Sequence, residues 1–319
     1  GECDLTSEET TRTSCVLRLF GASLLRVQQA TEALPAEWAV RTQYRSRSGE
    51  TLLALTARTP EALEKARQSL RACFAADLYG EGEKGLADAV VQALETHRKL
   101  LVCSDAATGA LLEARLETVP GAEKVFDFGA MSYADAKTNA QIERQAERRA
   151  KQPENTARAL ARVQAAQKVV GAELAAGSVR RGEDTLLFLG TQKGCWVRHV
   201  PEAEAPGLWL LDMVRRAACN LPQAEGTRWQ RYRDPVSPQL ETRDKTAPAQ
   251  EPPQAEKPHK KHRLRTVLLV LLVLALAALA AGWYYTGGDL TALPQKLQQL
   301  HADSQPHAGA KLIAIFGQR

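Results

Sequence analysis

Apolar and polar positions alternate along this chain in blocks that predict an α/β protein. Short apolar or alternating runs, typical of strands, occur at residues 16–20, 39–46, 51–58, 99–104, 125–133, 186–189 and 196–200. Helical spacing of apolar residues occurs at 24–34, 60–74, 86–98, 108–116, 141–151, 153–170 and 208–219. Strands that alternate with helices indicate sheets covered by helices.

Turn and helix-capping signals in the sequence support two of these assignments. Ser48 and Gly49 separate two strand-like runs and predict a hairpin turn. Thr59, Pro60 and Glu61 have the order of capping hydroxyl, first-turn proline and first-turn acid, so they predict the start of a helix. From residue 222 onward, prolines among charged residues and glutamines predict a linker without a core.

The strongest apolar run is VLLVLLVLALAALAAGWYY, at residues 267–285. About nineteen residues at 1.5 Å each suffice to cross a hydrocarbon core as one helix. The run ends in a Trp-Tyr-Tyr sequence that suits a membrane interface, and a basic segment at 257–265 precedes it. We expect a single-pass protein of the cell membrane, with its N-terminal domains cytoplasmic and its C-terminal tail outside.

Composition narrows the range of partners and cofactors that the protein is expected to bind. The net charge of +5 is concentrated next to the apolar run, and aromatic residues make up 5% of the chain. We therefore attribute the basic charge to membrane orientation and expect no nucleic-acid partner. The six cysteines lie far apart and no C-x-x-C pair occurs, so we expect free thiols, no metal site and no cofactor.

A longer motif resembles a known family. Residues 104–126 read SDAATGALLEARLETVPGAEKVF, and residues 129–137 read GAMSYADAK. These segments resemble the C-terminal domain of the CinA family, which has AESCTGG, then LLAARLT-x-VPG, then TYSNEAK. Residues 15–82 resemble the KH-like domain that precedes it in the family. The resemblance implies a nicotinamide-nucleotide amidohydrolase fold and a tendency to form homo-oligomers.

The departures from the family pattern concern the catalytic groups. In the family, the serine of AESCTGG is the nucleophile, and the lysine and tyrosine of TYSNEAK lie nearby. The same alignment places Ala106 at the nucleophile position, while Tyr133 and Lys137 keep their family positions. One residue is lost between Tyr133 and Lys137. The glycine-rich family loop corresponds to residues 177–184, GSVRRGED, which has no glycine run.

Other groups remain candidates for the site. Ser104 is a possible substitute nucleophile, and Thr108 is a second hydroxyl nearby. The resemblance also assigns ligand contacts to Asp105, Thr108 and Gly109. The pair Arg180-Arg181 is a candidate phosphate clamp. The competing interpretation treats residues 104–108 as caps of a helix start, Lys137 as a solvated loop residue, and the arginine pair as an exposed turn.

These observations give the following expected organisation. The fold class is α/β: a small KH-like α/β domain, a three-layer α/β/α domain of the CinA C-terminal type, and one transmembrane helix. The expected parts are a flexible N-terminus (1–13), the KH-like domain (14–82), the CinA C-terminal-like domain (83–221), a linker (222–265), the span (266–286) and an outer tail (287–319).

Three functional hypotheses follow. The first is a membrane-anchored, catalytically degenerate CinA-like protein that acts as a binding or assembly module, with a nucleotide-like small molecule as a candidate ligand. The second is an active nicotinamide-nucleotide amidohydrolase with a rearranged site. The third is the cytosolic end of a longer envelope protein. The KH-like region has no G-x-x-G loop between its predicted helices, so we expect a structural or dimerising role for it.

Overall fold

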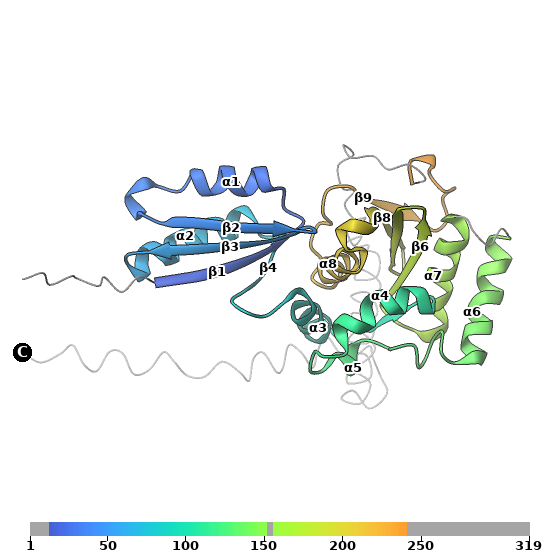
Figure 1. The fold of residues 1–319 in the computed structure, drawn as a ribbon. Coiled ribbons are helices and arrows are strands. Elements are labelled where there is room, and N and C mark those ends of the chain that lie inside the picture. Colours follow the sequence, from blue (N-terminus) through green and yellow to red (C-terminus); the bar gives the residue numbers. More distant parts are fainter. Residues whose placement is uncertain (1–12, 152–155, 241–319) are drawn as a thin grey trace, which may run out of the picture. The chain divides into compact units, whose positions relative to one another are not determined.

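A computed structural model describes residues 13–151 and 156–240 (Figure 1). All the described residues lie in one compact unit. The expected span (266–286), the outer tail and most of the expected linker lie outside the described residues. Among the residues that are described, no helix is both long enough and apolar enough to cross a bilayer.

The first part of the unit is a four-stranded antiparallel sheet with two helices on one face. Its strand order is β2-β3-β1-β4. The elements are β1 (Thr13–Phe20), α1 (Leu24–Glu32), β2 (Arg41–Arg47), β3 (Glu50–Ala57), α2 (Pro60–Cys73) and β4 (Leu78–Glu81). Leu17, Leu53 and Leu70 are fully buried between the sheet and the helices. This arrangement confirms every strand and helix expected before residue 74.

The two local signals in this part are also confirmed. Thr59 caps α2 by accepting a hydrogen bond from the Ala62 amide at 3.2 Å. Ser48 and Gly49 form the β2–β3 turn with φ values of 50° and 87°. Two successive positive φ values match the twist of a tight hairpin.

The second part is a five-stranded sheet of order β5-β6-β7-β8-β9. Its strands are β5 (Leu101–Cys103), β6 (Leu174–Arg181), β7 (Asp184–Gly190), β8 (Gly194–Pro201) and β9 (Thr227–Arg231). Its helices are α3 (Leu86–Thr96), α4 (Ala106–Leu116), α5 (Ala122–Val125), α6 (Ala136–Arg149), α7 (Thr156–Val170) and α8 (Pro206–Ala218). β5 and β6 are parallel, and the other neighbouring pairs are antiparallel.

Helices cover both faces of this sheet (Figure 1). Along β7, Leu187 and Leu189 pack in one core cluster with residues of α3, α4 and α8. The alternating residues Leu186 and Phe188 pack in the other cluster with residues of α6 and α7. Because successive side chains of a strand point to opposite faces, both faces of the sheet are apolar and buried. The structure therefore has the mixed α/β architecture that the sequence predicts.

Residues 125–133 were expected to form a strand, and this expectation is wrong. Phe126 makes one isolated parallel bridge to Leu101, and the chain then turns. Phe128 and Gly129 have positive φ values of 48° and 82°. The buried carboxylate of Asp127 accepts hydrogen bonds from the Met131 amide at 2.7 Å and from the Ser132 hydroxyl at 2.5 Å. These local bonds stabilise a turn in place of a sheet ladder.

Two further segments differ from the sequence-based expectation. Arg180 and Arg181 lie in β6, which forms a hairpin with β7, so they do not form an exposed turn. The expected linker begins inside the fold, because β9 pairs with β8 through Trp196↔Trp229. Their rings contact edge to face at 4.7 Å, and Leu240 is 2% exposed. Apolar contacts of these residues give the segment up to residue 240 a place in the core.

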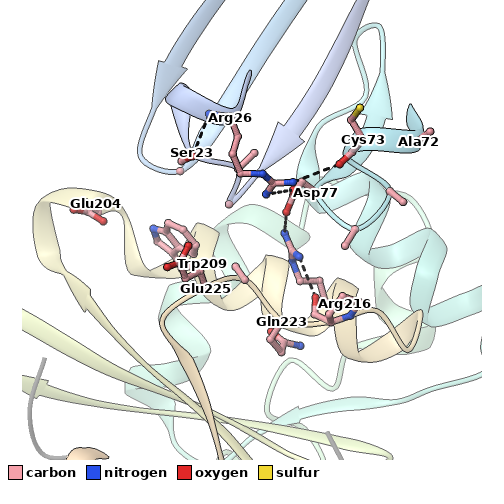
Figure 2. Close-up of a pocket in the computed structure, with 17 residues that line it drawn as sticks. Ser23, Arg26, Ala72, Cys73, Asp77, Glu204, Trp209, Arg216, Gln223 and Glu225 are labelled. Atoms are coloured by element: carbon pink, nitrogen blue, oxygen red, sulfur yellow. Dashed lines mark hydrogen bonds and ion pairs between the residues drawn. The ribbon is translucent and has the colours of Figure 1, made fainter. Parts of the chain in front are cut away.

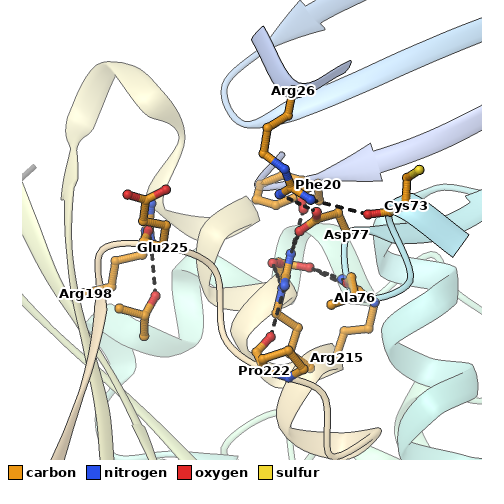
Figure 3. Close-up of polar contacts among 12 residues, drawn as sticks. Phe20, Arg26, Cys73, Ala76, Asp77, Arg198, Arg215, Pro222 and Glu225 are labelled. Carbon is orange, nitrogen blue, oxygen red and sulfur yellow. Dashed lines mark hydrogen bonds and ion pairs between the residues drawn. The ribbon is translucent and has the colours of Figure 1, made fainter. Parts of the chain in front are cut away.

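Side chains of α8 join the two parts of the unit (Figure 3). Arg216 donates to the Phe20 carbonyl at 2.8 Å, to Asp77 at 2.8 Å and to Asp212 at 2.7 Å. Arg215 donates to the Ala76 carbonyl at 2.8 Å and shares the carboxylate of Asp212. The Arg216 and Asp212 side chains are only 2% and 1% exposed. Each buried charge therefore has a partner, as a buried ion requires.

We predict that Asp212→Ala lowers the free energy of unfolding by about 3–5 kcal/mol, because it leaves two buried guanidinium groups without their shared carboxylate. Arg26→Ala is the matched control. Arg26 also pairs with Asp77, but its side chain is 53% exposed, so its loss should cost only about 0–1 kcal/mol. Urea unfolding of both variants measures the difference, and equal losses would contradict the assignment.

Candidate functional site

The candidate site lies where β5 ends and α4 begins. Cys103 is the last residue of β5, and Ser104 extends the strand with a hydrogen bond from its amide to the Ala176 carbonyl of β6 at 2.8 Å. Asp105 is the N-cap of α4 and accepts the Thr108 amide at 2.8 Å. A carboxylate at this position satisfies a free amide and complements the positive end of the helix dipole. Of these residues, Asp105 is the one that caps α4.

Two hydroxyl groups bond this carboxylate, and a third bonds one of them. Ser104 donates to one oxygen of Asp105 at 2.8 Å, and Thr108 donates to the other at 2.9 Å. Ser178 of β6 lies 3.0 Å from the Thr108 hydroxyl. Because the Thr108 proton is directed at Asp105, Ser178 is the donor in this last bond. The result is a chain of hydrogen bonds that leads from Ser178 through Thr108 to Asp105.

The position that the resemblance assigns to the nucleophile holds a methyl group. Ala106 is the first residue of α4 and is exposed. Ser104, the proposed substitute, is 1% exposed and its hydroxyl is bound to Asp105. The backbone of Gly177 approaches it closely, since a Cβ at that glycine would lie 3.0 Å from the Ser104 oxygen. Ser104 is therefore not placed to attack a ligand from outside.

Tyr133 packs against α4 and donates its hydroxyl to Glu113. Its ring lies directly on Gly109: a Cβ there would be 2.3 Å from the Tyr133 oxygen. Gly129 has the same relation to the ring, at 2.6 Å. Burial raises the pKa of the Tyr133 phenol well above its ordinary value, and the hydrogen bond to Glu113 adds to the shift. The tyrosine to which the resemblance assigns a site role thus directs its proton at Glu113 of α4.

The other predicted site residues are more dispersed. Lys137 is an exposed residue in the first turn of α6, so its expected loop position is wrong. Lys137 interacts electrostatically with Asp135, the cap of α6. Arg180 is exposed, and Arg181 donates to the Thr156 hydroxyl at 2.8 Å. The structure brings Ser104, Asp105 and Thr108 together, but shows no bond between them and Lys137.

Sequence reasoning missed Ser178 and Glu113 as parts of the site. Ser178 required the register of β6, which the sequence interpretation treated as a loop. Glu113 lies one helical turn after Gly109 on α4, so its proximity to that glycine was readable from helical spacing. Its contact with Tyr133 depends on the turn at residues 127–133, for which the sequence pattern predicts a strand.

A separate cavity of about 700 Å³ lies between α1, α2 and α8 (Figure 2). Many of its lining residues are glycine or alanine, which leave the space open. Arg26, Asp77 and Arg216 are charged residues that line the cavity. Trp209 and Cys73 also line it and appear on opposite sides of the view in Figure 2. Trp209 is covered by the Arg198 guanidinium, 3.7 Å from the ring centre. Burial lowers the pKa of Arg198 to about 10.

No group of three His, Cys, Asp or Glu side chains with metal-binding geometry occurs among the residues that the structure describes. The acidic side chains of the candidate site are instead used as acceptors for hydroxyl and amide groups. Asp105 receives three such bonds. These bonds hold Asp105 in place as the N-cap of α4.

Comparison with known proteins gives one consistent result. Residues 83–178 match the family described as the CinA C-terminal domain. The CinA-like protein of Anaeromyxobacter dehalogenans (strain 2CP-1) is 33% identical over 105 residues, which are 32% of this chain and 26% of that protein. These matches support a relationship between this region of the chain and the CinA family. A CinA-like protein of Desulfovibrio desulfuricans is 32% identical over 139 residues, or 39% of this chain and 31% of that protein.

The matched region spans about a quarter to a third of these curated relatives. Among solved structures, a CinA superfamily protein from Klebsiella pneumoniae covers 42% of this chain and 96% of its own, with 14% identity and a TM-score of 0.34. A competence or damage-inducible protein from Enterobacter asburiae covers 42% of this chain, with 9% identity and a TM-score of 0.32. The CinA match begins at residue 83, just before α3, and ends at Ser178 in β6.

We predict that the Tyr133 phenol stays protonated well above pH 10, the ordinary value for tyrosine. Since the folded pKa is raised, this group contributes stability below about pH 10 and loses that contribution as the pH rises further. A spectrophotometric titration of phenolate absorbance, with Tyr133→Phe as the reference for subtraction, measures the shift. A difference spectrum that titrates near pH 10 would contradict the buried hydrogen bond to Glu113.

Proposed function

We propose that this protein is a catalytically silent, membrane-anchored member of the CinA family that acts as a binding or assembly module. The observation that supports this proposal is Ala106. In the resembling enzymes this position supplies the attacking serine, and here it is an exposed alanine at the start of α4. A methyl group cannot form the covalent intermediate that this chemistry requires.

The surroundings of Ala106 also support loss of activity. Nucleophilic attack needs a hydroxyl, a base that removes its proton and room for the substrate. The Ser104 hydroxyl is buried and bound to Asp105, and the Tyr133 hydroxyl is bound to Glu113. Lys137 stands exposed on α6. The groups that family members use together therefore have separate structural partners in this protein.

What remains is a preorganised helix start that suits a polar ligand. Hydroxyls of Thr108 and Ser178 lie beside the positive end of α4. The Asp105 carboxylate already complements the positive end of α4, so a ligand beside these hydroxyls is proposed from the family resemblance. On this basis we propose a nucleotide-like molecule as the ligand, bound without hydrolysis. The tether at residues 267–285 would hold this module at the cytoplasmic face of the membrane, and association of copies would be consistent with the family resemblance.

One observation favours the alternative of an active amidohydrolase with a rearranged site. The Ser178–Thr108–Asp105 chain ends in a half-buried serine whose proton is directed along the chain to a carboxylate. A serine with such a relay has the elements of an activated nucleophile. In that case Ser178, which comes from β6, would replace the serine that the family places at the start of α4.

We predict that the full chain in detergent hydrolyses nicotinamide mononucleotide no faster than a heat-denatured sample. A CinA enzyme with the family serine, assayed in parallel, is the positive control. Loss of a serine nucleophile costs several orders of magnitude in rate, so the two samples should differ by at least about a thousandfold. Turnover within about tenfold of the control would reject the proposal that the protein is catalytically silent.

If turnover is found, Ser178→Ala should abolish it, and Thr108→Val should lower it by about a hundredfold or more because the relay to Asp105 is cut. Ser46→Ala is the matched control, since this hydroxyl lies on β2 and bonds Thr51 at 3.0 Å, in the first sheet. Unchanged rates in both site variants would remove Ser178 from the reaction.

A further inference from the structure

The cavity between α1, α2 and α8 is separate from the candidate site at the start of α4, because the two share no lining residue. Its volume of about 700 Å³ falls within the range of about 300–1,000 Å³ that is typical of small-molecule sites. The β1–α1 loop, the β2–β3 turn, the α2–β4 loop and the α8–β9 loop all contribute to its wall. A ligand in this cavity therefore contacts both parts of the unit.

Two buried polar atoms of the cavity wall lack a hydrogen-bond partner among the described residues. They are the indole Nε1 of Trp209 and the amide Oε1 of Gln223. These residues are only 7% and 4% exposed. Native proteins nearly always satisfy a buried polar atom with a protein group, a water molecule or a ligand. The two atoms therefore indicate that polar groups enter the cavity.

The local geometry leaves both atoms open to the cavity. Gln223 donates its amide nitrogen to the Met213 carbonyl at 3.0 Å, and this bond identifies its oxygen as the free end. At Gly49, which also lines the cavity, a Cβ would lie 3.0 Å from Cε2 of Trp209, the carbon bonded to Nε1. Because Gly49 has no side chain, this edge of the ring stays uncovered. The wall thus offers one donor and one acceptor, which complement the C=O and N–H of a peptide group.

One end of the cavity has an excess of negative charge. Glu204 ends the short helix at Glu202–Glu204, and Glu225 lies in the α8–β9 loop; both are exposed and line the cavity. Figure 2 shows both on the same side of the view as Trp209. The guanidinium of Arg198, which lies over the Trp209 ring, attracts both carboxylates. Two carboxylates against one guanidinium favour a further cation, such as an ammonium group.

The other end has an excess of positive charge. Arg26, Arg215 and Arg216 share the carboxylates of Asp77 and Asp212. Three guanidinium groups therefore face two carboxylates. Arg215 and Arg216 are buried, and each also donates to a backbone carbonyl. The Arg26 side chain is half-exposed and lines the cavity, so Arg26 is the group that can pair with a carboxylate of a ligand.

We propose that this cavity binds a short peptide with free termini. The ammonium group of the peptide lies at Glu204 and Glu225, and its carboxylate pairs with Arg26. A peptide group between them accepts a hydrogen bond from Trp209 and donates one to Gln223. An amine, an acid or water would each satisfy only some of these groups. Since the peptide contacts both parts of the unit, its binding also stabilises their junction.

Titration calorimetry of the full chain in detergent, with trialanine as the probe, tests the proposal. We expect trialanine to bind at one site. N-acetyl-trialanine lacks the ammonium group and trialanine amide lacks the carboxylate, so each should bind about tenfold more weakly or worse through the loss of one charge-assisted contact. Putrescine, a diamine without a peptide group, should bind no more tightly than these two derivatives.

Two exposed variants assign each terminus of the peptide to its end of the cavity. Glu225→Gln and Arg26→Gln should each weaken trialanine binding by about fivefold or more. Glu225→Gln should leave the affinity for N-acetyl-trialanine unchanged, and Arg26→Gln should leave that for trialanine amide unchanged, because the paired group is already absent. Glu147→Gln and Arg144→Gln are the matched controls, since both residues are exposed on α6. They should not change the affinity for trialanine.

Four results would overturn the proposal. Absence of measurable binding at millimolar trialanine would mean that water alone fills the cavity. Equal affinity for trialanine and its two blocked derivatives would remove the role of the termini. Unchanged affinity in both cavity variants would place the peptide elsewhere. Displacement of trialanine by nicotinamide mononucleotide would place it at the start of α4.

Discussion

The arrangement of the two parts of the unit depends on the hydrogen bonds and ion pairs of Arg216. This residue comes from α8, in the second part of the unit, and its donors reach a carbonyl of β1 and the carboxylate of Asp77 in the first part. Asp212 fixes it from one helical turn earlier. Buried charges tolerate few alternative partners, so such a cluster specifies geometry more than it adds stability. Arg216 and Asp77 also line the cavity between α1, α2 and α8.

The apolar core supports this joint from beside it. Phe20, the last residue of β1, is fully buried and packs edge to face on Trp209 at 4.9 Å. It belongs to the core cluster of the second sheet, although its own strand belongs to the first. Gly49 leaves room for this contact, because a Cβ there would lie 2.7 Å from the Trp209 ring. Apolar and ionic contacts therefore meet at the same junction.

The sequence predicted the elements whose signals are local. Thr59 and its proline start α2, and Ser48-Gly49 turns β2 into β3, because caps and tight turns depend on a few neighbouring residues. The errors have longer-range causes. Asp127 converts a strand-like run into a turn through side-chain bonds. The arginines of β6 are in a strand because β7 pairs with them, a contact that no local pattern records.

The pairing of β9 with β8 sets a lower limit on how far the folded region extends. A fragment that stopped at residue 221, where helical periodicity fades, would lose the partner of Trp196 and the cover that Leu240 provides. Without β9, β8 would expose its backbone edge and the Trp196 ring to solvent. Such exposed edges promote aggregation of recombinant fragments. Expression boundaries for crystallisation or binding work belong beyond residue 240.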